Sequence, residues 1–525
     1  MNRRIWKALG IAVCMLALAA PRAMAETNSH YVSNNEQFAD AVRTINNESK
    51  IGDKNEIVLM ENITLGGNYI LTNGKTTTIK GKEGENRKIS INGSSAGITV
   101  TGEGTVLNLG AEGYAEKLTI DGNAKGAFIT VSGGATAYMY ENVTLQNRQQ
   151  VDQACVVLEE NSVFNMHGGV IQNCKGKYGG VSLKNGSRFI MEGGTISECE
   201  ANAGGGLYAD NSTVTIKDGT ISGCKAVNGY GGGLYAKNST ITIEGGTISG
   251  CTTSDAGMGG GLYAYHSTIT ISGGTIENNK ATYGGGVALN SSTIIAITNW
   301  KVIGNEAYKT KGRNGGIGGG IYLESVLMNV SDGSNKIYNN QAEGHGADIC
   351  LDGSTSSIEL PNAAGMEAFY CKSGIKIDNW YNDNPRYTPS KDVNPVDVSK
   401  TLTGKQSLVA SYKADPVRIE IDANGGVGGS GSQTVQKGTN VTLEAPTKKG
   451  HLFKGWKDEK GNSYPAGEDG KVKITVTGDM TLTAEWKKLP SAENLPKTGD
   501  ESPVLLWGAA LAVSAAACFM LRRRK

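Results

Sequence analysis

Cysteine recurs at one position of a repeated segment in the middle of the chain, and a repeated thiol could act as a nucleophile or as half of a disulfide. A nucleophilic thiol needs a neighbouring base and a polar setting, whereas here each cysteine has copies of itself at the same position. Asparagine occupies the position in later repeats. We interpret these residues as inward-facing packing groups, with disulfides between neighbouring repeats as the alternative. The position holds Cys174, Cys199, Cys224 and Cys251, then Asn279, Asn305 and Asn340.

Gly344-His345-Gly346 resembles the Gly-His-Gly motif of polygalacturonases. The other motifs of that family, Asn-Thr-Asp, Asp-Asp and Arg-Ile-Lys, are absent from this sequence, so the paired carboxylates that glycoside hydrolysis requires are missing. A calcium-dependent lyase would need several aspartates stacked on one face, but Asp210, Asp218 and Asp255 fall at different phases of the repeat. We therefore expect no catalytic residue, no metal site and no cofactor.

Tyrosine also recurs at one phase of the repeat, at Tyr208, Tyr235, Tyr263 and Tyr322, and Cys350 takes the same position one repeat later. If these side chains face outward, they form an aromatic column on which sugar rings or a partner protein could stack. Repetition alone also aligns identical side chains, so aromatic stacking between repeats is the alternative, which we favour. The four tyrosines remain the candidate ligand-facing residues.

Two short motifs alternate with a period of roughly 25 residues through this part of the chain. Short runs of alternating apolar and polar residues separate them, and each run is too small to bury its own apolar side. Stacked copies solve this problem, because every strand then pairs with its copy about 4.8 Å away. The Gly-Thr-Ile-Ser-x-Cys motif lies at 194–199, 219–224 and 246–251, and Gly-Gly-Gly-Leu-Tyr lies at 204–208, 231–235 and 259–263.

The repeats predict an all-β fold: a right-handed parallel β-helix of about twelve coils spanning residues 26–385. The segment resembles the pectin-lyase-like β-helices of bacterial surface proteins, a superfamily that holds lyases, glycosidases and adhesins. An N-terminal helix is expected to cover the first coil, with Ser33-x-x-Glu36 as its capping box. Its apolar face comprises Phe38, Ala41, Val42 and Ile45, while Leu207, Val214, Ile216 and Ile221 are expected inside the coil and Thr213, Thr215, Thr220 and Tyr208 outside.

A second module follows a polar linker at residues 386–415. Residues 416–488 carry an Asn-Gly-Gly turn at 424–426, a Gly-x-x-Phe-x-Gly-Trp run at 450–456 and a closing Ala-x-Trp at 484–486. These features resemble one internalin-type B repeat, a small β-grasp-like module, although His451 stands where that family usually has tyrosine. We expect Phe453, Trp456 and Trp486 to form its core. In the family such modules act as stalks or interaction units.

The N-terminal segment has the pattern of a secretion signal. Arg3, Arg4 and Lys7 precede an apolar run at 8–20, which is shorter than the roughly 20 residues needed to span a bilayer. Ala23-Met24-Ala25 provides a small-x-small cleavage site. We expect residues 1–25 to be removed by cleavage between Ala25 and Glu26.

The C-terminal segment, residues 495–525, combines a pentapeptide, an apolar span at 503–521 and a basic tail at 522–525. The apolar span can halt in the bilayer while the basic tail stays in the cytoplasm. This order is similar to the sorting signal of sortase-anchored proteins of Gram-positive bacteria. The resemblance implies that a sortase cuts between Thr498 and Gly499 and joins Thr498 to peptidoglycan, with 489–494 as the spacer. The pentapeptide is Leu495, Pro496, Lys497, Thr498 and Gly499.

Fifty-one basic and 50 acidic residues nearly cancel and show no basic stripe, so we expect no nucleic-acid partner. The sequence as a whole predicts a secreted, wall-anchored surface protein whose β-helix presents a ligand-binding face for host or environmental glycans or proteins. A surface-displayed polysaccharide lyase or glycoside hydrolase is the alternative, and a structural stalk is a further one. An enzyme needs a local cluster of carboxylates, whereas a binding surface can be as uniform as these repeats.

Overall fold

The computed structural model describes two compact units, one within residues 1–413 and one within 414–525. The predicted signal and sorting segments lie outside the described residues. Within the described part of the chain, no helix is both long and apolar enough to cross a membrane. The described residues are 27–93, 97–149, 152–310, 315–329, 335–352, 355–360, 376–382, 401–403, 405–413, 416–429, 431–436, 440–467, 469–476 and 478–489.

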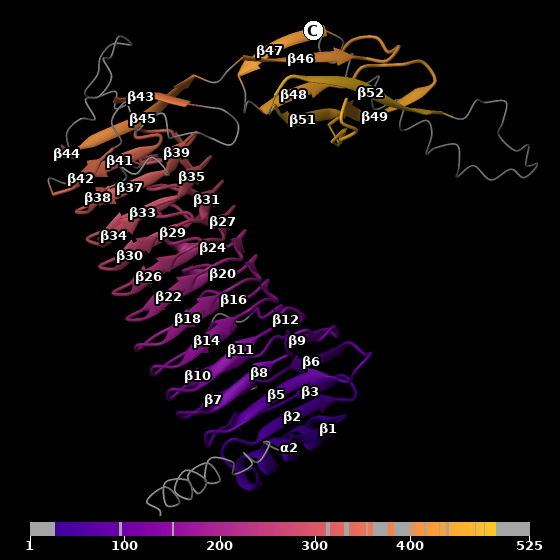
Figure 1. Cartoon of the computed structure of the whole chain (residues 1–525), viewed down its shortest axis with the longest axis vertical. Coiled ribbons are helices and arrows are strands. Elements are labelled where there is room, and N and C mark those ends of the chain that lie inside the picture. The colour runs from indigo at the N-terminus through magenta and orange to yellow at the C-terminus, as the bar shows by residue number, and fades with distance from the viewer. Residues whose placement is uncertain are drawn as a thin grey trace, which may run out of the picture. The chain divides into compact units, whose positions relative to one another are not determined.

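The first unit is a right-handed parallel β-helix of about twelve coils, as the repeats predict (Figure 1). Most coils contribute one strand to each of three long sheets, here named A, B and C. Sheet A contains β1 (Thr27–Val32), β2 (Lys54–Leu59), β5 (Thr76–Gly81), β8 (Val106–Leu109), β11 (Thr136–Met139), β14 (Val163–Met166), β18 (Arg188–Met191), β22 (Thr213–Ile216), β26 (Thr240–Ile243), β30 (Thr268–Ile271) and β34 (Thr293–Ile297).

Sheet B follows sheet A in every coil, and sheet C completes the turn. Sheet B contains β3 (Ile63–Leu65), β6 (Arg87–Ile91), β9 (Leu118–Gly122), β12 (Val143–Gln146), β15 (Val170–Gln172), β19 (Thr195–Ser197), β23 (Thr220–Ser222), β27 (Thr247–Ser249), β31 (Thr275–Glu277), β35 (Lys301–Ile303) and β39 (Lys336–Tyr338). Sheet C contains β4 (Asn68–Leu71), β7 (Gly97–Thr101), β10 (Ile129–Ser132), β13 (Val156–Leu158), β17 (Val181–Leu183), β21 (Leu207–Asp210), β25 (Leu234–Lys237), β29 (Leu262–Tyr265), β33 (Val287–Asn290), β37 (Ile321–Glu324) and β41 (Ile349–Asp352).

A fourth parallel sheet, D, begins at the coil that holds Cys174 and lies between sheets B and C. It contains β16 (Lys175–Tyr178), β20 (Glu200–Ala203), β24 (Lys225–Tyr230), β28 (Thr252–Thr253), β32 (Lys280–Ala281), β36 (Glu306–Ala307) and β40 (Gln341–Ala342). A small sheet, E, forms beyond β34 from β38 (Leu327–Asn329), β42 (Ser357–Glu359) and β44 (Leu402–Thr403).

The alternation of apolar and polar residues sets which side chains fill the coil. Val214 stacks on Ile241 and Ile269 in sheet A, and all three are fully buried, while their threonine neighbours face outward. The predicted inner residues Leu207, Ile216 and Ile221 are buried as well, so they belong to the continuous apolar core of the coil.

Helix α2 (Asn35–Glu48) covers the first coil with the predicted face, because Phe38, Ala41, Val42 and Ile45 are all buried. The predicted capping box is wrong by one residue. Asn34 is the N-cap and accepts a hydrogen bond from the Gln37 amide at 2.9 Å, while the Gln37 side chain accepts from the Ser33 amide at 2.7 Å. An asparagine and a glutamine thus take the capping roles that we assigned to serine and glutamate.

The opposite end of the β-helix is covered by antiparallel strands. β45 (Gln406–Lys413) pairs with β41 of the last coil, and β43 (Lys376–Asn382) pairs with β45. Residues 401–403 and 405–413 therefore belong to the β-helical unit rather than to the linker predicted at 386–415. The physical reason is the open edge of the last coil, whose amide and carbonyl groups need partners.

The second unit consists of a mixed sheet and a two-stranded sheet. Trp456 is fully buried at its centre, whereas Phe453 and Trp486 are partly buried and pack against that core. The mixed sheet has the order β47 (Gly431–Gln436), β46 (Pro416–Asp422), β52 (Met480–Lys488), β49 (His451–Asp458) and β50 (Ser463–Pro465), and the smaller sheet pairs β48 (Asn440–Glu444) with β51 (Lys471–Thr475).

Candidate functional site

The predicted tyrosine column lies on sheet C and projects from the outer side of the coil, but most of its rings are covered. Tyr208, Tyr263 and Tyr322 are 7%, 5% and 4% exposed, and Tyr235 is half-buried. Ring centroids lie 5.4 Å apart between Tyr208 and Tyr235 and 5.3 Å apart between Tyr235 and Tyr263. The predicted stacking between coils is confirmed. The expectation that these tyrosines face solvent is wrong.

A second column of residues covers the tyrosines. Each member stands directly before a glycine-rich segment and forms an isolated parallel bridge with the member in the next coil. The sequence analysis missed this column, because its residue type changes from coil to coil although its position does not. The column contains Tyr230, Met258, Tyr283, Ile317 and His345, and Tyr178 on β16 packs against Tyr208 with ring centroids 4.3 Å apart.

Burial also fixes the chemical state of the tyrosine hydroxyls. It raises the pKa of Tyr235 to about 12, and burial raises the pKa values of Tyr208, Tyr263 and Tyr322 as well. These hydroxyls stay protonated near neutral pH and do not serve as general bases. The tyrosine column is a packed layer on the outer side of the coil.

The cysteines and asparagines form the predicted ladder inside the coil. Cys174, Cys199, Cys224 and Cys251 are free thiols and at most 1% exposed. Each thiol lies near the carbonyl oxygen two residues earlier, as for Cys199 and Ser197 at 3.3 Å. The hydrogen bonds of Cys199 with its neighbouring thiols, together with burial, raise its pKa. A thiol that no substrate can reach does not act as a nucleophile, so burial supports the packing interpretation.

The asparagines extend the ladder with hydrogen bonds from coil to coil. The Asn279 amide nitrogen donates to Asn305 Oδ1 at 3.0 Å, and Asn305 Nδ2 donates to Asn340 Oδ1 at 3.0 Å. Asn340 Nδ2 donates in turn to Asp348 Oδ1 at 2.8 Å, and Asp348 is 1% exposed. Asp348 was not expected in this role, because it comes from the glycine-rich segment before β41.

Two further residues near the ladder escaped the sequence analysis. Cys155 is fully buried and its thiol contacts that of Cys174, although the spacing of the repeat does not place it in the ladder. Arg148 occupies the ladder position one coil before Cys174 and is also fully buried. The backbone carbonyl of Arg148 accepts from the Lys175 amide, as that of Cys174 accepts from the Glu200 amide. This amide pairing is the signal that aligns Arg148 with the cysteines.

His345 lies beside two nucleophilic groups at the covered end of the coil. Its Nδ1 atom is 2.7 Å from Ser407 Oγ on β45 and 3.9 Å from Cys350 Sγ on β41. Ser407 and Cys350 are 3% and 2% exposed, so a substrate does not reach either group. The histidine thus contacts both β45 and the last coil.

Two carboxylates do come together on sheet C. Glu324 on β37 is in register with Asp352 on β41, and each is the last residue of its strand. Burial and the charge of Asp352 raise the pKa of Glu324. Asp352 accepts a hydrogen bond from the Tyr322 hydroxyl at 3.0 Å and pairs with Lys405 at 3.3 Å. Among the described residues, no group of three or more histidine, cysteine or acidic side chains is arranged to hold a metal ion.

Hydroxyl groups form a regular, partly exposed array on the β-helix. On sheet A, Thr213, Thr240 and Thr268 are stacked in register, and a second column of threonines runs parallel two residues later. Sheet B repeats the arrangement with Thr195, Thr220, Thr247 and Thr275. The side chains are partly or fully exposed and carry no charge. The second column on sheet A contains Thr215, Thr242 and Thr270.

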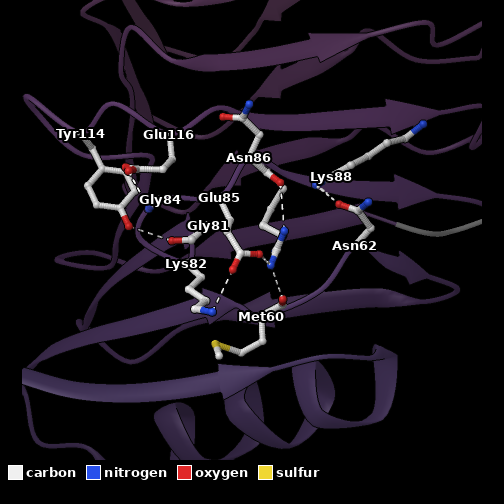
Figure 2. A network of polar contacts seen from close by, with 11 residues as sticks. Met60, Asn62, Gly81, Lys82, Gly84, Glu85, Asn86, Lys88, Tyr114 and Glu116 are labelled. Carbon is white, nitrogen blue, oxygen red and sulfur yellow. Dashed lines mark hydrogen bonds and ion pairs between the residues drawn. The ribbon is translucent and has the colours of Figure 1, made fainter.

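Near the first coils, a polar network surrounds the turn that follows β5 (Figure 2). Glu85 accepts from Lys82 at 2.8 Å and pairs with Arg87, which also donates to the Met60 carbonyl. The Tyr114 hydroxyl donates to the Gly81 carbonyl at 2.9 Å. Each of these contacts joins parts of the same turn or of adjacent coils. The network therefore holds the turn in place.

Comparisons with known proteins agree with the two units. Residues 154–385 match a family model described as a right-handed β-helix region, and residues 416–490 match a divergent InlB B-repeat domain. A protein of Evansella cellulosilytica named "Putative Gly-rich membrane protein" is 31% identical over 123 residues, which cover 22% of this chain and 12% of that protein. The chain thus matches only a small part of its relative. No solved structure matches the chain.

The fold and the family matches together define the class of protein. The protein is a parallel β-helix joined to a B-repeat module, a combination that fits a surface display protein. The β-helix fold occurs in lyases and in non-enzymes alike, so the particular function depends on what the exposed faces of the coil can bind.

Proposed function

We propose that this protein is a surface protein of a Gram-positive cell wall, anchored by a sortase, that binds glycans or proteins through the exposed faces of its β-helix. The hydroxyl array on sheets A and B carries the binding part of the proposal. It supplies donors and acceptors at the spacing of the coils, about 4.8 Å, and an extended ligand can contact several coils at once. Weak contacts repeated along one rigid surface add up through effective concentration.

Binding is tested by screening the purified protein against arrayed glycans and surface proteins. We expect the double variant Thr213→Lys and Thr240→Lys to lose at least tenfold in affinity for its ligand, because two ammonium groups interrupt an uncharged surface. Thr99 and Thr130 stack on sheet C in earlier turns of the β-helix, and the same two changes at these residues provide the matched control. Equal affinity of the test and control variants would count against the hydroxyl array.

A displayed carbohydrate-active enzyme is the second candidate, and Glu324 with Asp352 is the observation that favours it. Two neighbouring carboxyl groups are the minimum for acid–base chemistry on a glycosidic bond, and the raised pKa of Glu324 suits a proton donor. The same ligands should then be analysed for products. Reducing-end or unsaturated products that disappear in Glu324→Gln would establish the enzyme and overturn the adhesin proposal.

The anchoring part of the proposal rests on the motif at 495–499. In the sorting reaction, a sortase thiol breaks the Thr498–Gly499 peptide bond, and an amino group of peptidoglycan then takes the Thr498 acyl group. The spacer at 489–494 is short, so the B-repeat module would lie within the wall or close against it.

Anchoring is tested by changing Leu495 to alanine in the protein expressed in a sortase-containing Gram-positive host. We expect most of the protein to leave the muramidase-released wall fraction, because the pentapeptide no longer fits the sortase. The matched control changes Leu489, in the same segment but outside the motif, to alanine. An unchanged amount of wall-linked protein in the Leu495 variant would refute sortase anchoring.

A further inference from the structure

The B-repeat module has a basic pocket that its stalk-like family role does not explain. The pocket has a volume of about 480 Å³ and lies over strands β49 and β52. Four lysines line it, and the single lining carboxylate, Glu485, lies 3.9 Å from Lys457. Four ammonium groups against one carboxylate leave an excess of three positive charges. The lysines are Lys448, Lys454, Lys457 and Lys488.

Local strand geometry brings one of these lysines to the pocket. In the antiparallel pair of β49 and β52, Phe453 is opposite Trp486 and Gly455 is opposite Glu485, so Lys454 is an extra residue without an opposite partner. Such a bulge redirects a side chain that regular pairing would place elsewhere. At the end of the same pair, His451 is opposite Lys488. Three of the four lysines thus come from two paired strands, and Lys448 comes from the segment before β49.

An indole ring forms part of the pocket wall. Trp486 is partly exposed, and its Nε1 atom donates to the Ala423 carbonyl at 3.1 Å, which fixes the plane of the ring. Phe453 packs against it edge-on, with centroids 5.5 Å apart. Lys448 Nζ donates to the Asn424 carbonyl at 2.7 Å and lies 5.7 Å from the indole centroid. The ring and this ammonium group are therefore already positioned in the free protein.

We propose that this pocket binds an anionic polymer built from sugar or polyol units. The indole face takes the apolar face of a sugar or polyol, and the lysines take the phosphate or carboxylate groups that link or decorate it. The volume suits one or two such units, which favours a repeating chain over a folded partner. Phosphodiester polymers of the wall and carboxylated polysaccharides of a host share this chemistry. The proposal stands on the second unit and needs no particular ligand of the β-helix.

The test titrates the purified protein with poly(glycerol phosphate), with hyaluronan and with single-stranded DNA, by calorimetry and by tryptophan fluorescence. We expect binding of at least one of the first two polymers, with an affinity that falls about twentyfold or more when salt rises from about 50 to 200 mM, as for roughly three ionic contacts. Preference for the phosphate polymer indicates a wall ligand, and preference for hyaluronan indicates a host ligand. Tighter binding of DNA than of either polymer overturns the proposal.

Charge-reversal variants place the binding in the pocket. Lys454→Glu with Lys488→Glu is expected to weaken polymer binding by at least tenfold and to leave binding by the β-helix unchanged. Lys460→Glu with Lys473→Glu is the matched control, because both lysines are exposed, belong to the same module and lie outside the pocket. Equal losses in the two double variants would show an effect of net charge alone and refute the pocket. Absence of binding to both polymers would refute it as well.

Discussion

Replacing Gly232 by alanine is expected to lower the free energy of unfolding of the β-helix by about 3 kcal/mol or more, because a methyl group has no room between two coils. A Cβ atom at this position would lie 2.3 Å from the Gly260 carbonyl oxygen and 2.6 Å from that of Thr252. Both oxygens belong to the backbone of the next coil, so no side-chain rotation relieves the clash. The φ angle of Gly232 lies outside the left-handed region, so the cost is steric and comes from separating the coils.

The change is measured as the shift in the urea midpoint, with limited proteolysis to locate the weakened coil, because a stacked repeat need not unfold in one step. Gly66→Ala is the control: its Cβ would meet no atom within 4 Å, and its φ also lies outside the left-handed region. We expect that control to stay within about 0.5 kcal/mol of the unchanged protein. A Gly232 variant as stable as the Gly66 variant would mean that the coils separate at no cost.

The glycine segments show why the repeat could be predicted so well. In a stacked coil, each position faces its own copy, so an error in register of two residues would bring Gly232 against Met258 or Leu262 instead of Gly260. The sequence must therefore repeat its glycines, its inner isoleucines and its ladder residues in phase. The same repetition predicts which side chains are inside the coil, such as Val214 and Ile221, and where cysteine gives way to asparagine.

The covering of the tyrosines could not be predicted in the same way. Periodicity places Tyr208 on the outer side of the strand, but it does not say whether another part of the chain lies over it. The residues that cover the column share a position and not a type: Tyr230, Met258 and Tyr283 fill the same place in successive coils. A variable outer layer leaves no repeated pattern in the sequence. For this reason the sequence favoured the tyrosines as the candidate ligand face, whereas the structure favours the threonines.

The ends of the β-helix were predictable only in part, because an end occurs once and repeats nothing. The apolar face of α2 has a helical period of its own and was identified. The Asn34 cap was missed because Ser33 and Glu36, one residue earlier, fit the same capping pattern. β45 was missed because its antiparallel pairing with β41 joins segments that share no motif.

Arg148 lies at the point where the number of sheets in the β-helix changes. Sheet D starts with Lys175, in the coil that follows Arg148, and the described residues of the earlier coils form no strand at this place. The guanidinium group donates to the Lys175 carbonyl at 2.7 Å on one side and to the Lys125 and Gly126 carbonyls at 2.6 and 2.9 Å on the other. It also donates to the Gln153 carbonyl at 2.6 Å. One side chain thus joins the irregular loop of one coil to the first strand of the new sheet.

Replacing Arg148 by methionine is therefore expected to lower the free energy of unfolding by about 3 kcal/mol, since four partly buried carbonyl groups lose a charged donor. Burial lowers the pKa of Arg148, but a guanidinium stays charged in proteins, so a charged donor is removed as well as several hydrogen bonds. Arg148→Lys should restore only a small part of the loss, because an ammonium group cannot match the planar arrangement of the donors. The measurement is again the urea midpoint.

Arg188→Met provides the control, because Arg188 is exposed on β18 of a neighbouring coil and the change removes the same group. We expect it to alter the free energy of unfolding by less than about 0.5 kcal/mol. If Arg148→Met were equally mild, water would have to enter and bond the carbonyls, and amide hydrogen exchange at residues 175–178 would stay slow. Fast exchange confined to those residues, with the later coils protected, is the result that follows if Arg148 holds the first strand of sheet D in place.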